Sequence, residues 1–427
     1  MSATLDLLAF AGAKHILPAT VRADAVRLLG DTLAVGAAAV GAAGEPEILA
    51  IARSMGAGDA ARLLGTGERL PAAGAAFVSA YRIHCLEWDA VHEPAVVHAM
   101  SVVTAALGAA IDRRGGCNED EALVALAVGV DVACGLGIAA DSALRFFRPA
   151  TAGVIGAALA VARLDGAPLD QALGLAYSSC SGTMQAHVEG SMTLPFQVAN
   201  AARAAIVASD LATAGFTAPI DGLEGPFGYF KLIDAGDLSR YTARLGKVWR
   251  IAEISIKPFP SGRASHAALG ELAQFAGQQF AAIELACPPL IHRLVGRPWK
   301  AAMTPAYARL CLQFLSALML RDGRIDPRRF TPASFADPAL AEQAARFTLV
   351  DDGNPDPNAL FPQQLTLTLP SGERLVRAVP HTLGSPDAPL SPEQAQAKLS
   401  LMRDLADSAC DPRIFTQPLA YFTQPLA

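Results

Sequence analysis

Three long runs of this sequence are apolar on nearly every side of a helix, and such runs fold only where other segments surround them. The runs are Ser101–Asp112, Glu119–Ala140 and Ala150–Leu164. A helix that is apolar all round is a buried helix. We therefore expect a helical bundle over about residues 20–245, with little strand.

The length and composition indicate a large, well-buried protein with more than one core. The chain has 427 residues, of which 52% are hydrophobic and 17% are charged. A chain of this length usually forms two domains. The apolar residues are mostly Ala, Leu and Val rather than aromatic residues, and Ala and Leu favour helices. Gly153 and Gly156 would let neighbouring helices approach closely.

The pattern changes after Lys247 and predicts a second, smaller domain. Alternating Leu and Thr around a turn that contains Gly372 indicate a β-hairpin. The expected elements are an extended segment at Val248–Ile256, strands at Phe347–Val350, Gln364–Leu369 and Arg374–Val379, and helices at Tyr307–Leu320 and Pro392–Asp407. The predicted fold is mainly α, with a large all-helical domain over residues 1–257 and 396–427 and a smaller α+β domain over residues 258–395.

Charge and cysteine usage exclude several classes of protein. The net charge is −6 and no cluster of Lys and Arg appears, so we expect no nucleic-acid partner. The seven cysteines include no C-x-x-C pair, which fits a reducing, cytoplasmic compartment and predicts no zinc or iron–sulfur site. No signal peptide is evident at the N-terminus. The run Ala122–Ala140 is long enough to span a membrane, but Asp131 at its centre favours a buried helix instead.

The segment from residue 84 to residue 98 concentrates polar side chains just before an apolar helix. Its titratable residues are His84, Glu87, Asp89, His92, Glu93 and His98. Such groups are costly to bury without partners, and a helix N-terminus favours a bound anion. On the residues alone, a solvated loop is the more common explanation. A metal site is less favoured because the spacing matches no common zinc pattern.

Two further segments place polar side chains near expected helix starts. Arg148 follows two Phe residues and precedes Pro149, and a guanidinium there would grip a carboxylate through two hydrogen bonds. His187 and Gln197 flank a turn at Gly190. Taken separately, a surface arginine and a hydrogen-bonded core histidine are the more common explanations.

Lys257 ends an apolar segment and precedes two prolines, Pro258 and Pro260, with Arg263 and His266 close behind. If Lys257 is desolvated, its pKa falls toward the range useful for a base. A surface lysine whose stem covers apolar residues is an equally good explanation.

Taken together and in order, these segments resemble the MmgE/PrpD family, which includes 2-methylcitrate dehydratase, cis-aconitate decarboxylase and iminodisuccinate epimerase. The resemblance covers nearly the whole chain. The matching segments are Glu87-Trp-Asp89 with His98, Phe147-Arg-Pro-Ala-Thr-Ala-Gly153, Gly190 to Ala202, Gly215-Phe-Thr-Ala-Pro219, and Ile256-Lys257-Pro-Phe-Pro260 through His266. It implies a large helical domain, a smaller α+β lid with a cleft between the two, a homodimer, and no metal or organic cofactor.

The chain departs from the family pattern at several positions. Leu194 and Gln197 stand where the family has Lys and His, Arg148 where it has His, and Phe314 where Tyr is frequent. Lys257, His98 and Asp89 match the pattern.

The resulting hypothesis is a lyase or isomerase that removes a proton next to a carboxylate of a small di- or tricarboxylate, without a cofactor. Lys257 or His98 would be the base and the other the acid, and Asp89 would orient His98. The expected substrate-binding residues are Arg148, His92, His187, Gln197, Arg263 and His266. The alternative is a catalytically altered family member that only binds a carboxylate ligand or a protein partner, and the replacement at Leu194 motivates it.

Overall fold

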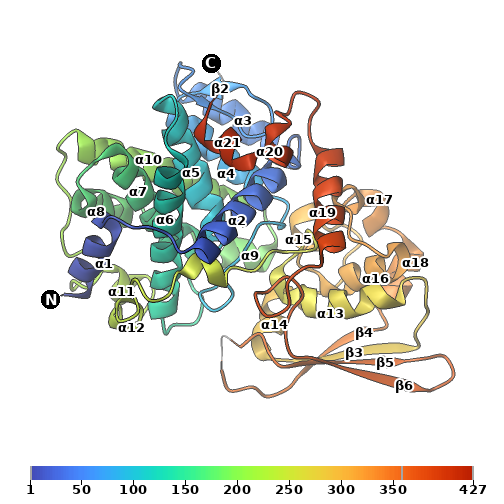
Figure 1. Cartoon of the computed structure of the whole chain (residues 1–427). Helices are drawn as coiled ribbons and strands as arrows, with labels where there is room; N and C mark the ends of the chain where they lie inside the picture. The colour runs from blue at the N-terminus through green and yellow to red at the C-terminus, as the bar shows by residue number, and fades with distance from the viewer. Residues whose placement is uncertain (1, 357–358, 426–427) are drawn as a thin grey trace.

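Helices make up most of this computed structural model, which describes residues 2–356 and 359–425. Figure 1 shows a large helical part beside a smaller part built on a sheet. The helices of the helical part are α1 (Ala3–Gly12), α2 (Ala19–Ala37), α3 (Glu45–Ser54), α4 (Ala72–His84), α5 (Ala99–Arg113), α6 (Glu119–Ala139), α7 (Arg148–Asp165), α8 (Leu169–Ser178), α9 (Gln185–Glu189), α10 (Thr193–Thr213), α11 (Tyr229–Leu232) and α12 (Ser239–Thr242). Short 3-10 helices are η1 (Arg250–Glu253), η2 (Arg263–Ser265), η3 (Ala273–Phe275) and η4 (Pro327–Arg329).

The three apolar runs form the buried helices α5, α6 and α7, as predicted. The side chain of Asn118 accepts a hydrogen bond from the Asp120 backbone and so caps the start of α6. Helices α6 and α7 pack so closely that a Cβ on Gly156 would lie 2.3 Å from the carbonyl oxygen of Gly129. Only glycine fits there, which confirms the predicted close helix contact.

Helix α6 is the only helix among the described residues that is long and apolar enough to cross a membrane. In its most apolar window, however, 94% of the residues are buried inside the protein. Its central Asp131 accepts hydrogen bonds from the Tyr241 hydroxyl and the Arg250 backbone, both at 2.8 Å. Core packing and satisfied hydrogen bonds therefore account for α6.

The smaller part contains a four-stranded sheet with the order β4–β3–β5–β6. Its elements are β3 (Ala282–Cys287), β4 (Phe347–Asp351), β5 (Gln363–Thr368), β6 (Arg374–Val379), α13 (His266–Leu272), α14 (Pro289–Val295), α15 (Pro305–Ala308), α16 (Leu312–Asp322), α17 (Pro332–Phe335) and α18 (Pro338–Ala344). The predicted hairpin is confirmed as the antiparallel pair β5–β6. The central strand β3, which the sequence analysis did not predict, runs parallel to β4 and antiparallel to β5.

One face of this sheet is covered by helices. Figure 1 shows α13, α16 and α18 on the same side of the strands. The alternation along β3 follows from this arrangement, because Ile283, Leu285 and Cys287 are buried while Glu284 on the opposite face is exposed.

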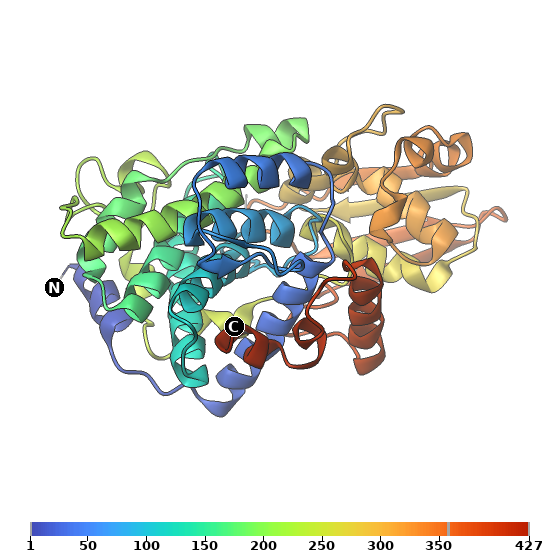
Figure 2. The same ribbon diagram turned by 90° about the horizontal axis from the view of Figure 1, so that it is seen from above.

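The end of the chain returns to the helical part through α19 (Pro392–Leu405), α20 (Arg413–Thr416) and α21 (Pro418–Thr423). Figure 2 shows this segment, in red, beside the blue helix α2. Lys398 on α19 forms a buried ion pair with Asp31 on α2 at 2.5 Å. The predicted domain boundary between residues 395 and 396 falls inside the continuous helix α19.

Three local predictions differ from the structure. The segment Val248–Ile256, predicted to be extended, contains the 3-10 helix η1 before it pairs with Val91 through Ser255. The predicted helix Tyr307–Leu320 is broken between α15 and α16. The helical part also contains a very short antiparallel pair, β1 (Ala61–Arg62) with β2 (Arg69–Leu70), so it is not entirely helical.

Candidate active site

The loop from Cys85 to His98 joins the buried helices α4 and α5 and carries the titratable cluster. Two of its residues, Glu87 at φ 54° and Val96 at φ 53°, adopt the left-handed conformation that residues other than glycine rarely adopt. Such a conformation costs about 1–3 kcal/mol and persists only where surrounding contacts enforce it. Most of this loop is buried and only Pro94 in it is exposed, so the solvated-loop explanation is wrong.

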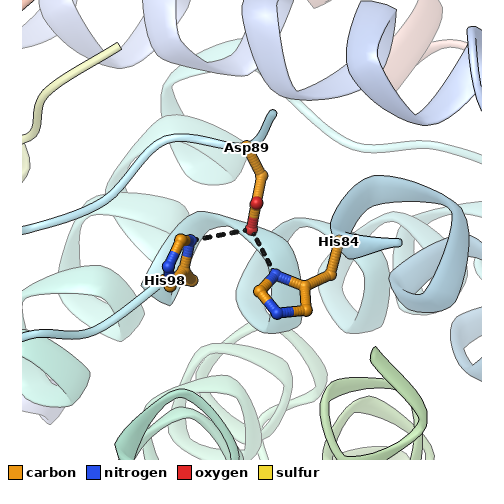
Figure 3. A group of neighbouring side chains, drawn as sticks. All are labelled: His84, Asp89 and His98. Atoms are coloured by element: carbon orange, nitrogen blue, oxygen red, sulfur yellow. Dashed lines mark hydrogen bonds and ion pairs between the residues drawn. The ribbon is translucent and has the colours of Figure 1, made fainter. Parts of the chain in front are cut away.

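Asp89 is the centre of the cluster. One of its oxygens, Oδ2, lies 2.8 Å from Nδ1 of His84 and 3.0 Å from Nδ1 of His98, and it accepts a hydrogen bond from Ser101. Figure 3 shows the two imidazoles on either side of this oxygen. The side chain of His84, at the end of α4, is fully buried, and that of His98, just before α5, is 12% exposed. The ends of two helices thus hold the imidazoles against one carboxylate.

Lys257 reaches the same cluster from the segment that follows η1. Its Nζ donates to the backbone oxygen and to Oε2 of Glu87, both at 3.1 Å, and lies 3.8 Å from Oδ1 of Asp89. The lysine is fully buried, so a surface position for it is excluded. Trp88 donates to the backbone oxygen of Pro258 at 3.2 Å and ties the two segments together.

The charges of the cluster compensate one another. Burial opposes ionisation of Glu87, but Lys257 and His84 outweigh it and lower the pKa of Glu87 to about 2. Burial also opposes ionisation of Asp89, but the charges of His84 and His98 outweigh it and hold the pKa of Asp89 well below its usual value. Burial works against the charged form of His84, yet Asp89 and Glu87 raise its pKa. Burial dominates at His98 and lowers its pKa, so this imidazole is neutral near pH 7.

A pocket of about 70 Å³ opens in front of the cluster, between the helical part and the sheet part. Its polar wall consists of Glu87, Glu93, His98, Arg148, His187 and Arg263. Asp89, His84 and Lys257 are not in the wall but lie behind it. Of the three predicted catalytic residues, only His98 faces the pocket directly.

The two arginines predicted to bind substrate, Arg148 and Arg263, line the pocket, but each already pairs with a carboxylate of the protein. Nε and Nη2 of Arg148 donate to Asp234 at 2.5 and 3.2 Å. Arg263 donates to Glu93 at 3.0 and 2.7 Å. His187 also lines the pocket, and burial together with the nearby Arg297 lowers its pKa to about 4.

The structure places the other three predicted substrate-binding residues outside the pocket wall. Nε2 of His92 pairs with Glu253 at 2.9 Å. Gln197 accepts a hydrogen bond from the Thr183 backbone at 2.6 Å. His266 is fully buried and contacts Ser261 at 3.1 Å. Each of these side chains has an internal partner, although the amide nitrogen of Gln197 has none among the described residues.

Sequence reasoning did not assign roles to three residues that shape the site: His84, Glu87 and Arg309. Nη1 of Arg309 donates to the Cys85 carbonyl at 2.9 Å, at the end of α4, where a cation is favourable. The spacing of His84 from Asp89 was a usable signal, because both lie in the same polar segment. Arg309 sits in an apolar stretch with no acidic neighbour, and nothing in the sequence marks it.

His84, Asp89 and His98 also have the side-chain types that bind metal ions, and their ligand atoms lie within 4.8 Å of one another. The 2.8 Å contact of His84 is a hydrogen bond, the 3.0 Å contact of His98 is an ion-pair distance, and the Lys257 ammonium supplies a cation beside Asp89. We interpret the arrangement as a network that shares protons and compensates the charge of Asp89.

Comparison with known proteins gives a consistent result. The model of the MmgE/PrpD N-terminal domain matches residues 11–241, and that of the MmgE/PrpD C-terminal domain matches residues 259–411. The chain belongs to the MmgE/PrpD family.

Two curated relatives in this family are named cis-aconitate decarboxylases. The human protein is 26% identical over 77% of this chain and 72% of its own length. The mouse protein is 26% identical over 93% of this chain and 88% of its own length. The family resemblance stated from the motifs is therefore confirmed.

Proposed function

We propose that this chain is a lyase or isomerase that removes a proton from the carbon next to a carboxylate of a small substrate, without a cofactor. The observation that carries the proposal is the position of His98, which lies against the buried Asp89 and also lines the pocket. The family membership and the two relatives named as decarboxylases support an enzyme of the lyase type.

His98 has the properties that a general base needs. Its lowered pKa leaves the imidazole neutral and able to accept a proton near pH 7. Because Nδ1 faces Asp89, the other ring nitrogen, Nε2, is the one that would take the proton. Asp89 would then stabilise the imidazolium that forms, as a buried carboxylate does for a catalytic histidine.

Lys257 and His84 have supporting roles in this proposal. Lys257 holds Glu87 in its left-handed conformation through two hydrogen bonds, and His84 holds the second side of Asp89. Lys257 does not line the pocket, and Glu87, which does, is ionised by its pairing with Lys257, so neither residue donates a proton directly to the substrate. In this proposal the protonated His98 is the group that returns a proton to the substrate.

A second candidate function is binding of a carboxylate or a partner without turnover. The pairing of Arg148 with Asp234 and of Arg263 with Glu93 favours it, because it removes two groups expected to stabilise negative charge in a reaction. We also propose a homodimer, from the family resemblance, and a cytoplasmic location, from the free cysteines.

Proton NMR in deuterated water separates the two functions. Small mono-, di- and tricarboxylates, including cis-aconitate and iminodisuccinate, would be incubated with the folded protein. Loss of an α-proton signal or appearance of a product in at least one acid supports the enzyme. Binding of an acid with no exchange and no product, in protein with an intact thermal unfolding transition, supports the binding function.

A further inference from the structure

The candidate pocket is walled largely by hydrocarbon. Its apolar side chains come from both parts of the molecule and include Leu144, Phe147, Met184, Leu194, Leu294 and Leu310. Leu194 is the second residue of α10 and is 4% exposed. Such a wall favours binding of the apolar portion of a ligand, because binding removes the apolar surfaces of both the ligand and the wall from water.

The charged groups of the wall cancel one another. Arg148 is neutralised by Asp234 and Arg263 by Glu93, and Lys257 behind the wall is paired with Glu87. Burial keeps His98 and His187 neutral. Within residues 2–356 and 359–425, no cation in the wall is left for a second or third substrate carboxylate. A carboxylate buried without a partner carries a large desolvation cost.

One carboxylate can still be accommodated at the wall. Three long helices, α5, α7 and α10, begin at the wall, and none of them has a side-chain cap. The wall residues that mark these helix starts are His98 before α5, Phe147 before α7 and Leu194 in the first turn of α10. Their first turns carry partial positive charge beside the neutral His98. This field suits one anionic group next to the base.

The size of the pocket points to a small ligand. Its volume of about 70 Å³ is less than half of the roughly 150 Å³ of an apolar cavity that binds benzene. Either acid therefore requires the wall to move outward, but a short aliphatic acid requires less movement than a citrate-like tricarboxylate.

We propose that the pocket selects a short monocarboxylate with an apolar substituent as its ligand, and that Leu194 contributes to this selection. The inference rests on the proposed function for its chemistry, but the preference itself is a property of binding. It replaces the expectation of a di- or tricarboxylate with an acid that carries one carboxylate and a hydrocarbon end.

The test compares the affinity of the whole protein for two acids, 3-methylbutanoate and propane-1,2,3-tricarboxylate, by calorimetric titration at pH 7. We expect 3-methylbutanoate to bind more tightly by at least about tenfold, because its two methyl groups are buried at the apolar wall. Equal or tighter binding of the tricarboxylate, or no measurable binding of 3-methylbutanoate, would overturn the proposal.

Two variants test the role of Leu194. Leu194→Lys places a cation in the wall and is expected to improve binding of the tricarboxylate relative to 3-methylbutanoate by about tenfold. Leu194→Met keeps size and polarity and is expected to retain the wild-type preference. A folded Leu194→Lys protein with the wild-type preference would remove Leu194 from the proposal. If that variant does not fold, the wild-type comparison alone decides the ligand class.

The affinity test is independent of turnover. A preference for 3-methylbutanoate without proton exchange in any acid would leave this inference in place and overturn the proposed function. Proton exchange in a tricarboxylate that also binds more tightly than 3-methylbutanoate would support the proposed function and overturn this inference.

Discussion

His84 and Asp89 are joined by a 2.8 Å hydrogen bond between two side chains that solvent does not reach. Asp89 raises the pKa of His84 although burial opposes the charged imidazole. A group whose pKa is raised on folding stabilises the protein fully below its unfolded pKa, here about 6.5, and loses that contribution as pH rises through the folded pKa. The cluster therefore makes stability dependent on pH.

The variant His84→Gln tests this dependence. At pH 6 we expect it to unfold more easily than the wild type by about 1.5–3 kcal/mol, because a buried hydrogen bond to a charged group is lost. The difference should shrink toward pH 9, as the pH rises through the raised pKa of His84 and the wild-type imidazole loses its proton. Urea unfolding of both proteins at the two pH values measures it. A difference that is the same at pH 6 and pH 9 would contradict the assigned charge of His84.

Lys257 compensates two buried carboxylates, so its removal should be costly. We expect Lys257→Met to lower the free energy of unfolding by about 3–5 kcal/mol, because Glu87 and Asp89 then lack their shared cation. The double variant Lys257→Met/Glu87→Gln should lose less than the sum of the two single variants. Urea unfolding of the four proteins gives the coupling, and strictly additive losses would show that the two side chains do not interact.

The ion pair between Lys398 and Asp31 joins α19 to α2, two helices that are far apart in the sequence. Burial lowers the pKa of Lys398 and raises that of Asp31, against the attraction between them. Either Lys398→Met or Asp31→Leu alone should destabilise the protein by about 3–5 kcal/mol, whereas the combined variant should be much closer to the wild type. Thermal unfolding ranks the three variants. A double variant that is the least stable of the three would contradict this account.

A chelator distinguishes the proton-sharing network from a metal site at His84, Asp89 and His98. Dialysis against EDTA should leave proton exchange and the unfolding transition unchanged, because Lys257 supplies the compensating charge. Loss of exchange that zinc or manganese restores would instead assign these side chains as metal ligands.

The sequence predicts the fold class well because its strongest signals are local. Apolar runs identify α5, α6 and α7, and the turn at Gly372 identifies the hairpin β5–β6. It does not reveal β3, a six-residue strand whose pairing with β4 and β5 spans distant parts of the chain. The break between α15 and α16 is also missed, since no Gly or Pro marks Arg309, Leu310 and Cys311, where it falls.

The site is predicted less completely, because side-chain partners come from distant segments. The polar segment at residues 84–98 is recognisable, but nothing in the sequence shows that Asp234 and Glu93 neutralise Arg148 and Arg263. The same limit applies to His92, whose partner Glu253 lies 161 residues away. Long-range pairing, and not residue type, decides which of these groups remain free for a ligand.

The measurement that tests the central claim most directly is the rate of α-proton exchange in His98→Gln compared with His92→Gln. Both changes remove a histidine of the same loop, but only His98 lines the pocket. With an acid that the wild type exchanges, we expect His98→Gln to be slower by about 10²–10⁴-fold, the usual contribution of a general base. His92→Gln should stay within a few-fold of the wild type. Wild-type exchange rates in a folded His98→Gln protein would contradict the account.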